Sequence, residues 1–308
     1  MNIYAIIASM KKFLLLIIFV FLTINFANDI AHGALVSTRS YRIEQNKINK
    51  NEIKQIRELF KLHTLFANKH DLVGLKSLYY DKYINSDGFN REAYFASVKE
   101  TWDECDNLTY GNKINSIDIN GNNATAYIEE FAVGTIYDKI DTLSATGEIH
   151  AKSTSLYQLT KVNGKWLISG ENMLTDESAL LYGDARFMNI ELMVPNQVGA
   201  GEVYTTAVKT DADENTVILA SIEHDPVIYP SKIPNGPLRT MPKTNILERF
   251  IKANSDNLNE YAVASLAISK SLLQEDNSTK VYMAGIACIM KRINVIPKNN
   301  FINLEGNK

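Results

Sequence analysis

The run Lys161-Val162-Asn163-Gly164-Lys165-Trp166-Leu167-Ile168-Ser169 ends a long stretch in which polar and apolar residues alternate. Asn and Gly tolerate positive φ, so Asn163-Gly164 predicts a tight hairpin that sends Trp166 and Ile168 to one face of a sheet. A second turn signal, Asn120-Gly121-Asn122-Asn123, predicts another hairpin upstream. Residues 107–169 therefore predict long antiparallel strands.

Three segments with helical periodicity precede these strands. Apolar residues recur at helical spacing from Ile53 to Ala67. A second helix is predicted from Leu72 to about Tyr83, with Asp71 before it as an acceptor for free amides, and a third from about Arg91 to Cys105, with Asn90 as N-cap. Helices followed by long hairpins predict an α+β fold rather than alternating βαβ units.

This element order, closed by the Asn-Gly-Lys-Trp turn at 163–166, resembles the NTF2-like (SnoaL-like, nuclear transport factor 2) family. The resemblance covers about residues 51–176 and implies a cone, in which helices pack on a curved antiparallel sheet around a central cavity. Members of this family include enzymes, ligand binders and dimerisation modules, so fold alone selects no function. The resemblance implies a small apolar ligand in the cone or a homodimer through the sheet.

Five residues are candidates for contact with a ligand in such a cavity: His63, Tyr83, Trp102, Glu129 and His150. Each has a second interpretation that needs no ligand. His63 lies on the apolar stripe of the first helix, where the steroid-isomerase branch of the family uses a tyrosine, and could be a cavity base or a hydrogen-bonded core residue. Tyr83 and Trp102 could line a cavity wall or only pack in the core.

The two remaining candidates lie on predicted strands. Glu129 shares a strand face with Tyr127, Phe131 and Val133, which would place a carboxylate in an apolar lining and raise its pKa, unless that face is turned to water. His150 is flanked on its face by Glu148 and Lys152, a pattern that is equally typical of a solvated surface. No residue is assigned a catalytic role.

From Phe187 onward, short β-rich runs separated by turns predict an all-β, loosely immunoglobulin-like sandwich at residues 185–299. The predicted strands are 189–194, 202–209, 216–222, 261–268 and 281–295, and Ile246–Lys252 fits a helix or a strand. Five of the seven prolines fall between Pro226 and Pro242, which predicts a long semi-rigid connection. This connection is either a loop that recognises a protein partner through Tyr229 and Arg239, or a crossover without contacts.

The N-terminus predicts export. Lys11-Lys12 precede a short apolar core, Phe13 to Leu22, as in a secretory signal peptide covering residues 1–33, with cleavage after Ala27 or Gly33. The core is too short to span a bilayer comfortably, so no membrane anchor is expected after cleavage. A polar linker follows at 34–50. The expected location is the periplasm or the exterior of a bacterium.

Composition excludes several classes of function. The 308 residues carry a formal net charge of −3 with no long basic block, so nucleic-acid binding is not expected. Two cysteines, Cys105 and Cys288, are interpreted as buried thiols or as an interdomain bridge. No metal-binding or cofactor-binding motif is present, so no metal and no cofactor are expected.

The sequence as a whole predicts an exported two-domain binding protein, whose cone is a small-ligand or dimerisation module. The alternative is a cavity enzyme of the isomerase, dehydratase or cyclase type, which would use Glu129 or His63 as base for acid–base chemistry on a small apolar substrate.

Overall fold

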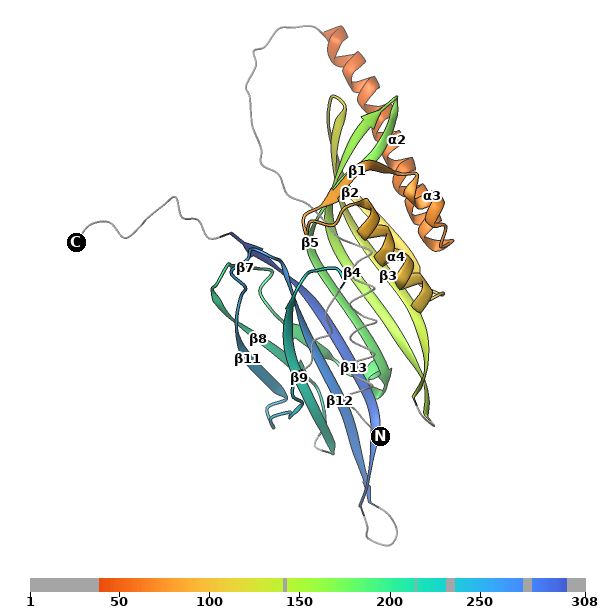
Figure 1. Ribbon diagram of the computed structural model, residues 1–308. Coiled ribbons are helices and arrows are strands. Elements are labelled where there is room, and N and C mark those ends of the chain that lie inside the picture. The colour runs from red at the N-terminus through yellow and green to blue at the C-terminus, as the bar shows by residue number, and fades with distance from the viewer. Residues whose placement is uncertain (1–38, 141–142, 214, 231–235, 274–278, 298–308) are drawn as a thin grey trace, which may run out of the picture. The chain divides into compact units, whose positions relative to one another are not determined.

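The computed structural model describes residues 39–297, except residues 141–142, 214, 231–235 and 274–278 (Figure 1). Unit 2, one of two compact units, contains residues 39–134 and 151–174, and unit 1 contains residues 135–150 and 175–297. Three strands, β3 (Asn123–Ile140), β4 (Leu143–Val162) and β5 (Lys165–Gly183), contribute residues to both units. The separability of domains 51–176 and 185–299 stays a prediction.

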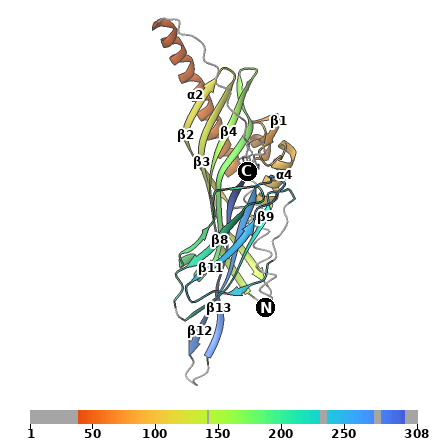
Figure 2. The ribbon, with the colours of Figure 1, turned by 90° about the vertical axis from the view of Figure 1, so that its left-hand side faces the viewer.

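The first helix of unit 2, α2, spans Arg39–Asn68 and is longer than predicted. Residues 39–50 are helical, so the prediction that they belong to a polar linker is wrong, and the helix begins more than two turns earlier than expected. Their Arg, Glu, Gln and Lys side chains have good helix propensity, so helix can extend without an apolar stripe. In both Figure 1 and Figure 2 the N-terminal end of α2 projects past the sheet of unit 2.

The predicted helix from Leu72 to Tyr83 is only partly correct. Helix α3 ends at Lys76 after five residues (Leu72–Lys76), and Tyr79–Asn85 is a strand, β1, parallel to β5. Its sequence, rich in aromatic residues, suits a half-buried strand, and Ile168 N donates to Leu78 O at 2.9 Å. Long-range pairing therefore overrides the helical spacing of the apolar residues.

The predicted helix starts are confirmed. Asp71 Oδ1 accepts from Gly74 N at 2.8 Å, and Asn90 Oδ1 accepts from Ala93 N at 2.9 Å. Helix α4 spans Arg91–Glu104 and buries Trp102, as predicted. The capping side chains satisfy amides that no residue within the helix can reach.

In unit 2 the strand order is β5-β4-β3-β2, with β2 at Thr109–Asn120. Both predicted turns are observed, with positive φ at Gly121, Asn163 and Gly164, and Trp166 and Ile168 are buried as expected. Glu52 of α2 fastens the helix to the last hairpin: its carboxylate accepts from Lys161 Nζ at 2.7 Å and from Trp166 Nε1 at 2.6 Å.

Unit 1 contains two sheets around one apolar core. The first has the order β10-β9-β12-β13-β5 and the second β11-β8-β6, and the core includes Val208, Leu266 and Ile289. The remaining bounds are η2 (Asp184–Phe187), β6 (Ile190–Met193), β7 (Gln197–Gly199), β8 (Val203–Thr210), β9 (Thr216–Pro226), β10 (Arg239–Thr240), β11 (Ile246–Lys252), β12 (Glu260–Leu273) and β13 (Thr279–Ile296). An immunoglobulin-like strand order stays a prediction.

Two segments left open by the sequence are now placed. Ile246–Lys252 is a strand, paired antiparallel with β8. The connection from Pro226 to Pro242 is not free of strand, because Arg239 and Thr240 pair with Ala220 and Leu219 at a sheet edge. Arg239 is exposed there and Tyr229 is half-buried.

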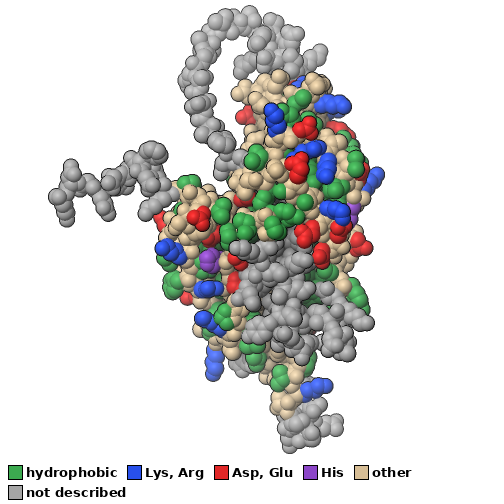
Figure 3. All heavy atoms as spheres, in the orientation of Figure 1, with side chains coloured by type: hydrophobic (Ala, Val, Ile, Leu, Met, Phe, Trp, Pro, Cys, Tyr) green, Lys and Arg blue, Asp and Glu red, His purple; other side chains and the backbone are tan. Residues whose placement is uncertain are grey.

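Both cysteines are buried free thiols, in agreement with the first of the two interpretations. On the face seen in Figure 3, acidic and basic side chains are interspersed, as the charge pattern of the sequence indicates. Within the described residues no helix has the length and apolar content needed to cross a bilayer. The predicted signal peptide lies outside the described residues.

Candidate functional site

Aromatic rings fill the interior of unit 2, where the resemblance implies a cavity. Ring centroids of Tyr79 lie 5.0 Å from Tyr83, 5.4 Å from Tyr94 and 4.9 Å from Phe95, and Phe60 lies 5.1 Å from Tyr157. These are the spacings of packed aromatic pairs. The rings come from α2, β1, α4 and β4, so elements far apart in sequence meet in this cluster.

A chain of hydrogen bonds runs through the rings. His63 Nε2 lies 2.9 Å from Tyr79 Oη, which lies 3.1 Å from Tyr94 Oη. Burial lowers the pKa of His63 to about 4, so its imidazole is neutral at physiological pH. His63 is therefore a hydrogen-bonded core residue, which was one of its two interpretations.

The prediction that Glu129 lines the interior is wrong. Its side chain is 30% exposed and its Oε1 accepts from Asn115 Nδ2 at 2.8 Å and from Lys113 Nζ at 3.3 Å. These two contacts lower the pKa of Glu129 rather than raise it. The interior face of β3 carries Glu130 instead, together with Ala126 and Ile128.

Glu130 is the interior carboxyl group that the sequence interpretation missed. Tyr157 Oη donates to Glu130 Oε2 at 2.7 Å, and burial raises the pKa of Glu130 to about 7. A second carboxyl group, Glu171, is fully buried nearby, and both carboxylates raise the pKa of Tyr157 after burial itself. The signal for Glu130 was present in the alternation of β3, but the wrong face was chosen.

The other sequence candidates are scattered. Tyr83 belongs to the interior cluster, whereas Trp102 Nε1 donates to Tyr110 Oη at 3.0 Å and its ring stacks on His70 at 4.7 Å. His150 is exposed, belongs to unit 1 and lies 3.8 Å from Glu148. The structure thus brings together His63 and Tyr83 through Tyr79, and does not bring Glu129 or His150 to them.

In chemical terms the interior offers an acid–base group near neutrality and hydroxyl donors, which is what proton transfer requires. Tyr79, Tyr83, Tyr157 and Glu130 are at most 4% exposed, so these described residues leave almost no accessible surface next to the acid–base group. Glu171, Ser153 and Ser155 have 0% exposure, and the two serine hydroxyls have no hydrogen-bond partner among the described residues. A ligand would have to displace aromatic rings to reach these groups.

An open groove lies elsewhere in unit 2, between α2 and the edge strand β2. Its volume is about 920 Å³, within the range of small-molecule sites. Leu65 and Phe131, which contribute to its lining, are 43% and 49% exposed. The lining consists of Arg57, Glu58, Lys61, Leu62, Thr64, Leu65, Asn68, Lys69, Gly111, Asn112, Ile114 and Phe131.

Side-chain hydrogen bonds hold the two walls of this groove together. Asn68 of α2 donates to Tyr110 O at 2.9 Å and accepts from Tyr110 N at 2.7 Å, so it pairs with the free edge of β2 as another strand would. Asn112 Nδ2 donates to Thr64 Oγ1 at 2.7 Å and to Phe60 O at 3.2 Å. The groove is therefore a fixed feature of the surface.

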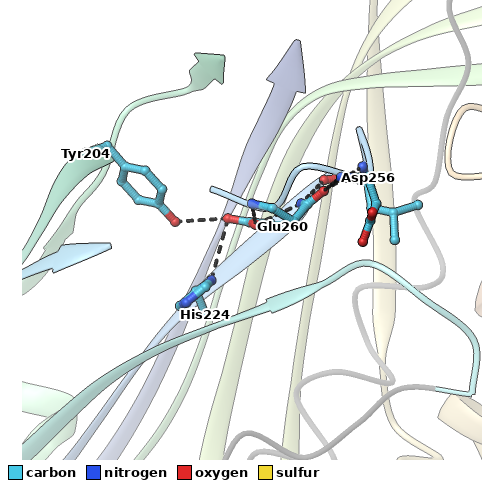
Figure 4. A network of polar contacts seen from close by, with 6 residues as sticks. Tyr204, His224, Asp256 and Glu260 are labelled. Carbon is cyan, nitrogen blue, oxygen red and sulfur yellow. Dashed lines mark hydrogen bonds and ion pairs between the residues drawn. The ribbon is translucent and has the colours of Figure 1, made fainter. Parts of the chain in front are cut away.

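Unit 1 contains a separate polar network around Glu260 (Figure 4). Tyr204 Oη donates to Glu260 Oε2 at 3.1 Å, and His224 Nδ1 lies 3.6 Å from the same oxygen. Asn254 donates to Glu260 Oε1 from its backbone at 2.7 Å and from its side chain at 2.8 Å. Burial opposes the charged form, yet these contacts hold the pKa of Glu260 below its ordinary value. Both oxygens are satisfied, so the network serves structure.

Among the described residues no group of His, Cys, Asp and Glu side chains has the arrangement of a metal site.

No protein-family model matches the chain, and no curated protein matches it. Solved structures similar to part of it include NTF2-like and ketosteroid isomerase-like proteins. A putative scytalone dehydratase from Novosphingobium aromaticivorans is 16% identical, with a TM-score of 0.35 over 42% of this chain and 86% of that chain. An NTF2-like superfamily protein from Salmonella enterica serovar Typhimurium is 17% identical, with a TM-score of 0.31 over 39% and 87%.

A hexachlorocyclohexane dehydrochlorinase from Novosphingobium barchaimii is 13% identical, with a TM-score of 0.33 over 41% of this chain and 86% of that chain. The activities in these names belong to those proteins. The description of unit 2 rests on its own elements: three helices, a parallel strand β1 and a sheet of long antiparallel strands.

Proposed function

We propose that this protein is an exported binding protein, in which the NTF2-like unit 2 is a binding module rather than a catalyst. One observation carries the proposal: the interior of unit 2 is filled by its own aromatic side chains, while a groove of about 920 Å³ is open on its outside. The periplasmic or extracellular location is part of the proposal and is supported by the apolar N-terminal segment.

The filled interior argues against catalysis because a reacting molecule needs space next to the acid and base groups. Displacing packed rings would cost the transfer and dispersion energy that holds them in the core. The neutral His63, bonded to Tyr79, and the tyrosines around it are explained by core packing alone.

An anionic aromatic dye, 8-anilinonaphthalene-1-sulfonate, tests the site of binding. The fluorescence of the dye should increase when the native protein is added to it, because the groove combines apolar residues with basic ones. Replacing Leu65, which is 43% exposed, by Ser should weaken dye binding without changing the thermal melting curve. Glu130→Gln should leave dye binding unchanged. Dye binding that responds to Glu130→Gln and not to Leu65→Ser would place the binding site in the interior and refute the proposal.

The second candidate function is a cavity enzyme with Glu130 as base and Tyr157 as donor. It is favoured by the pKa of Glu130, about 7, which suits general acid–base catalysis at neutral pH. This enzyme would act on a small apolar carbonyl compound in an opened form of the interior. Turnover of such a compound that is lost in Glu130→Gln and kept in Glu129→Gln would establish it.

A homodimer through the outer face of the sheet is a further mode of binding. Phe131 and Val133 are 49% and 44% exposed, and their spacing of two residues on β3 places them on the same face of the sheet. Sedimentation equilibrium on the mature protein would detect it. A role of the Pro226–Pro242 connection in binding a protein partner also stays a proposal, with exposed Arg239 as its best-placed side chain.

A further inference from the structure

The groove of unit 2 has a row of basic residues along one wall. Arg57, Lys61 and Leu65 follow one another at intervals of four residues on α2, and Lys69 comes directly after the last residue of the helix, with its amide still donating to Leu65 O at 3.2 Å. The four residues therefore continue a single ridge. Twelve residues separate the first from the last, which corresponds to about 18 Å along the helix axis. The ridge is long enough to contact three turns of another helix.

The floor of the groove is apolar. Leu62 and Leu65 of α2, Ile114 of β2 and Phe131 of β3 contribute its apolar lining. The ring of Phe131 lies on Gly111 of the neighbouring strand, so close that a Cβ at this position would be 2.2 Å from Phe131 Cζ. Glycine at this position lets the ring lie flat against the sheet, where it forms part of the floor.

The polar residues between these walls are already bonded to the protein. Thr64, Asn68 and Asn112 bond to one another or to the backbone, as described above. They fix the width of the groove and leave recognition to the apolar floor and the charged ridge.

The charges of the groove are unbalanced. Its lining has three basic residues and one acidic residue, although the whole chain has a net charge of −3. Glu58 pairs with Lys61 at 3.5 Å, and both side chains are exposed. Within the described part of the chain no ion pair involves Arg57 or Lys69.

From this geometry we propose that the groove docks an acidic amphipathic helix of a partner protein. This inference rests on the proposed binding function of unit 2. The apolar stripe of the partner helix covers Leu62, Leu65 and Phe131, and acidic side chains beside that stripe, four residues apart, meet the basic residues of the ridge. A second copy of this chain is a poor occupant, because two α2 ridges packed together would bring like charges into contact.

The experiment uses two double variants of the mature protein with the same change of charge. Lys61→Glu with Lys69→Glu reverses the ridge. Lys50→Glu with Lys54→Glu makes the matched change on exposed residues of α2 outside the groove. The probe is a fluorescein-labelled 16-residue helical peptide with a leucine stripe and glutamate elsewhere, and its counterpart has lysine in place of glutamate. Circular dichroism checks that both variants fold.

The expected result is saturable binding of the glutamate peptide in fluorescence anisotropy, weakened by added salt. The ridge variant should bind at least about tenfold more weakly, and the matched variant within about twofold of the parent, because like charges in contact disfavour docking strongly. The lysine peptide should not bind.

Five results would overturn the inference. The first is equal binding of both peptides, and the second is equal loss in both variants. The third is absence of glutamate-peptide binding while the dye still binds, which would leave the groove a site for small anionic amphiphiles and the proposed function intact. The fourth is that the parent protein binds phosphatidylglycerol vesicles, or associates with itself, and that only the ridge variant loses this property. The occupant of the groove would then be a membrane surface in the first case and a second copy of the chain in the second. The fifth is that the parent protein binds neither dye nor peptide, which would refute both proposals.

Discussion

Replacing Glu130 by Gln should make the protein more stable at alkaline pH and leave it nearly unchanged at acidic pH. Gln keeps an oxygen that can accept from Tyr157 Oη, now 2.7 Å from the carboxylate, and has almost the same volume. It removes only the ability to carry a charge. The substitution therefore isolates the cost of ionising this group in the core.

The magnitude follows from the two pKa values. Burial raises the pKa of Glu130 from 4.5 to about 7 in the folded state. The folded protein thus holds a proton that the unfolded chain releases, so stability is lost as pH rises from the lower value through the higher one. At 1.36 kcal/mol per unit, the cost is about 1 kcal/mol at about pH 5 and about 3 kcal/mol at about pH 8. Glu130→Gln should therefore gain about 2–3 kcal/mol relative to the parent between these two pH values.

Urea unfolding of parent, Glu130→Gln and Glu129→Gln at both pH values measures this difference. Glu129 is the matched control because it is the neighbouring residue, receives the same substitution and lies on the exposed face. Asp176, whose pKa burial also raises to about 7, contributes equally to all three proteins and cancels in the differences. A stability difference between parent and Glu130→Gln that does not change with pH, or an equal gain in Glu129→Gln, would refute the assignment of Glu130 to the core.

Three other predictions follow from the structure and the sequence. Glu52→Ala should destabilise unit 2 by about 1–3 kcal/mol in thermal or urea unfolding, because it leaves two partly buried donors without their acceptor, whereas Glu58→Ala, at an exposed site of the same helix, should cost less than about 0.5 kcal/mol. The pKa of Glu52 is lowered mainly by its bond to Lys161, so this contribution should be present above pH 4.5 and disappear as pH falls through the folded-state pKa. Trp166→Ala should cost about 3–5 kcal/mol, since the ring is 5% exposed; a loss below about 1 kcal/mol would show that it is not part of the core. N-terminal sequencing of exported protein should begin after Ala27 or Gly33, and an intact N-terminus in the membrane fraction would contradict export by a cleaved signal.

Local chemistry made part of this fold predictable. Asn163-Gly164 and Asn120–Asn123 form the hairpins that their φ preferences indicate, and Asp71 and Asn90 cap the helices that they precede. Such features depend on residues a few positions apart. The strand Tyr79–Asn85 was missed because its partner, β5, lies about 90 residues further along the chain and its own spacing also fits a helix.

The sequence interpretation missed Glu130 because it did not identify which face of β3 is buried. Both faces of β3 carry apolar residues, Tyr127, Phe131 and Val133 on one and Ala126, Ile128 and Ala132 on the other, so the alternation alone does not identify the buried face. The helices, β1 and β4 supply the rings of the interior, and the residues that β3 buries beside them, Ala126, Ile128, Glu130 and Ala132, have no aromatic rings. A sequence pattern of period two identifies two faces, but which one is buried depends on the volume that other elements bring.

The same distribution of volume links the packing of unit 2 to its proposed function. Alanines on the inner face of β3 let the aromatic rings close the interior, and Gly111 on the neighbouring strand lets Phe131 lie flat on the outer face. In unit 2 the apolar surface that remains open therefore lies at the edge beside α2, next to three basic side chains, and not inside a hollow cone. An apolar floor with a charged rim is the arrangement by which amphipathic helices are recognised, since the floor supplies affinity and the rim supplies orientation. Substitutions that enlarge the inner face of β3 should therefore disturb stability, and substitutions on the ridge of α2 should disturb binding, with little effect of either on the other property.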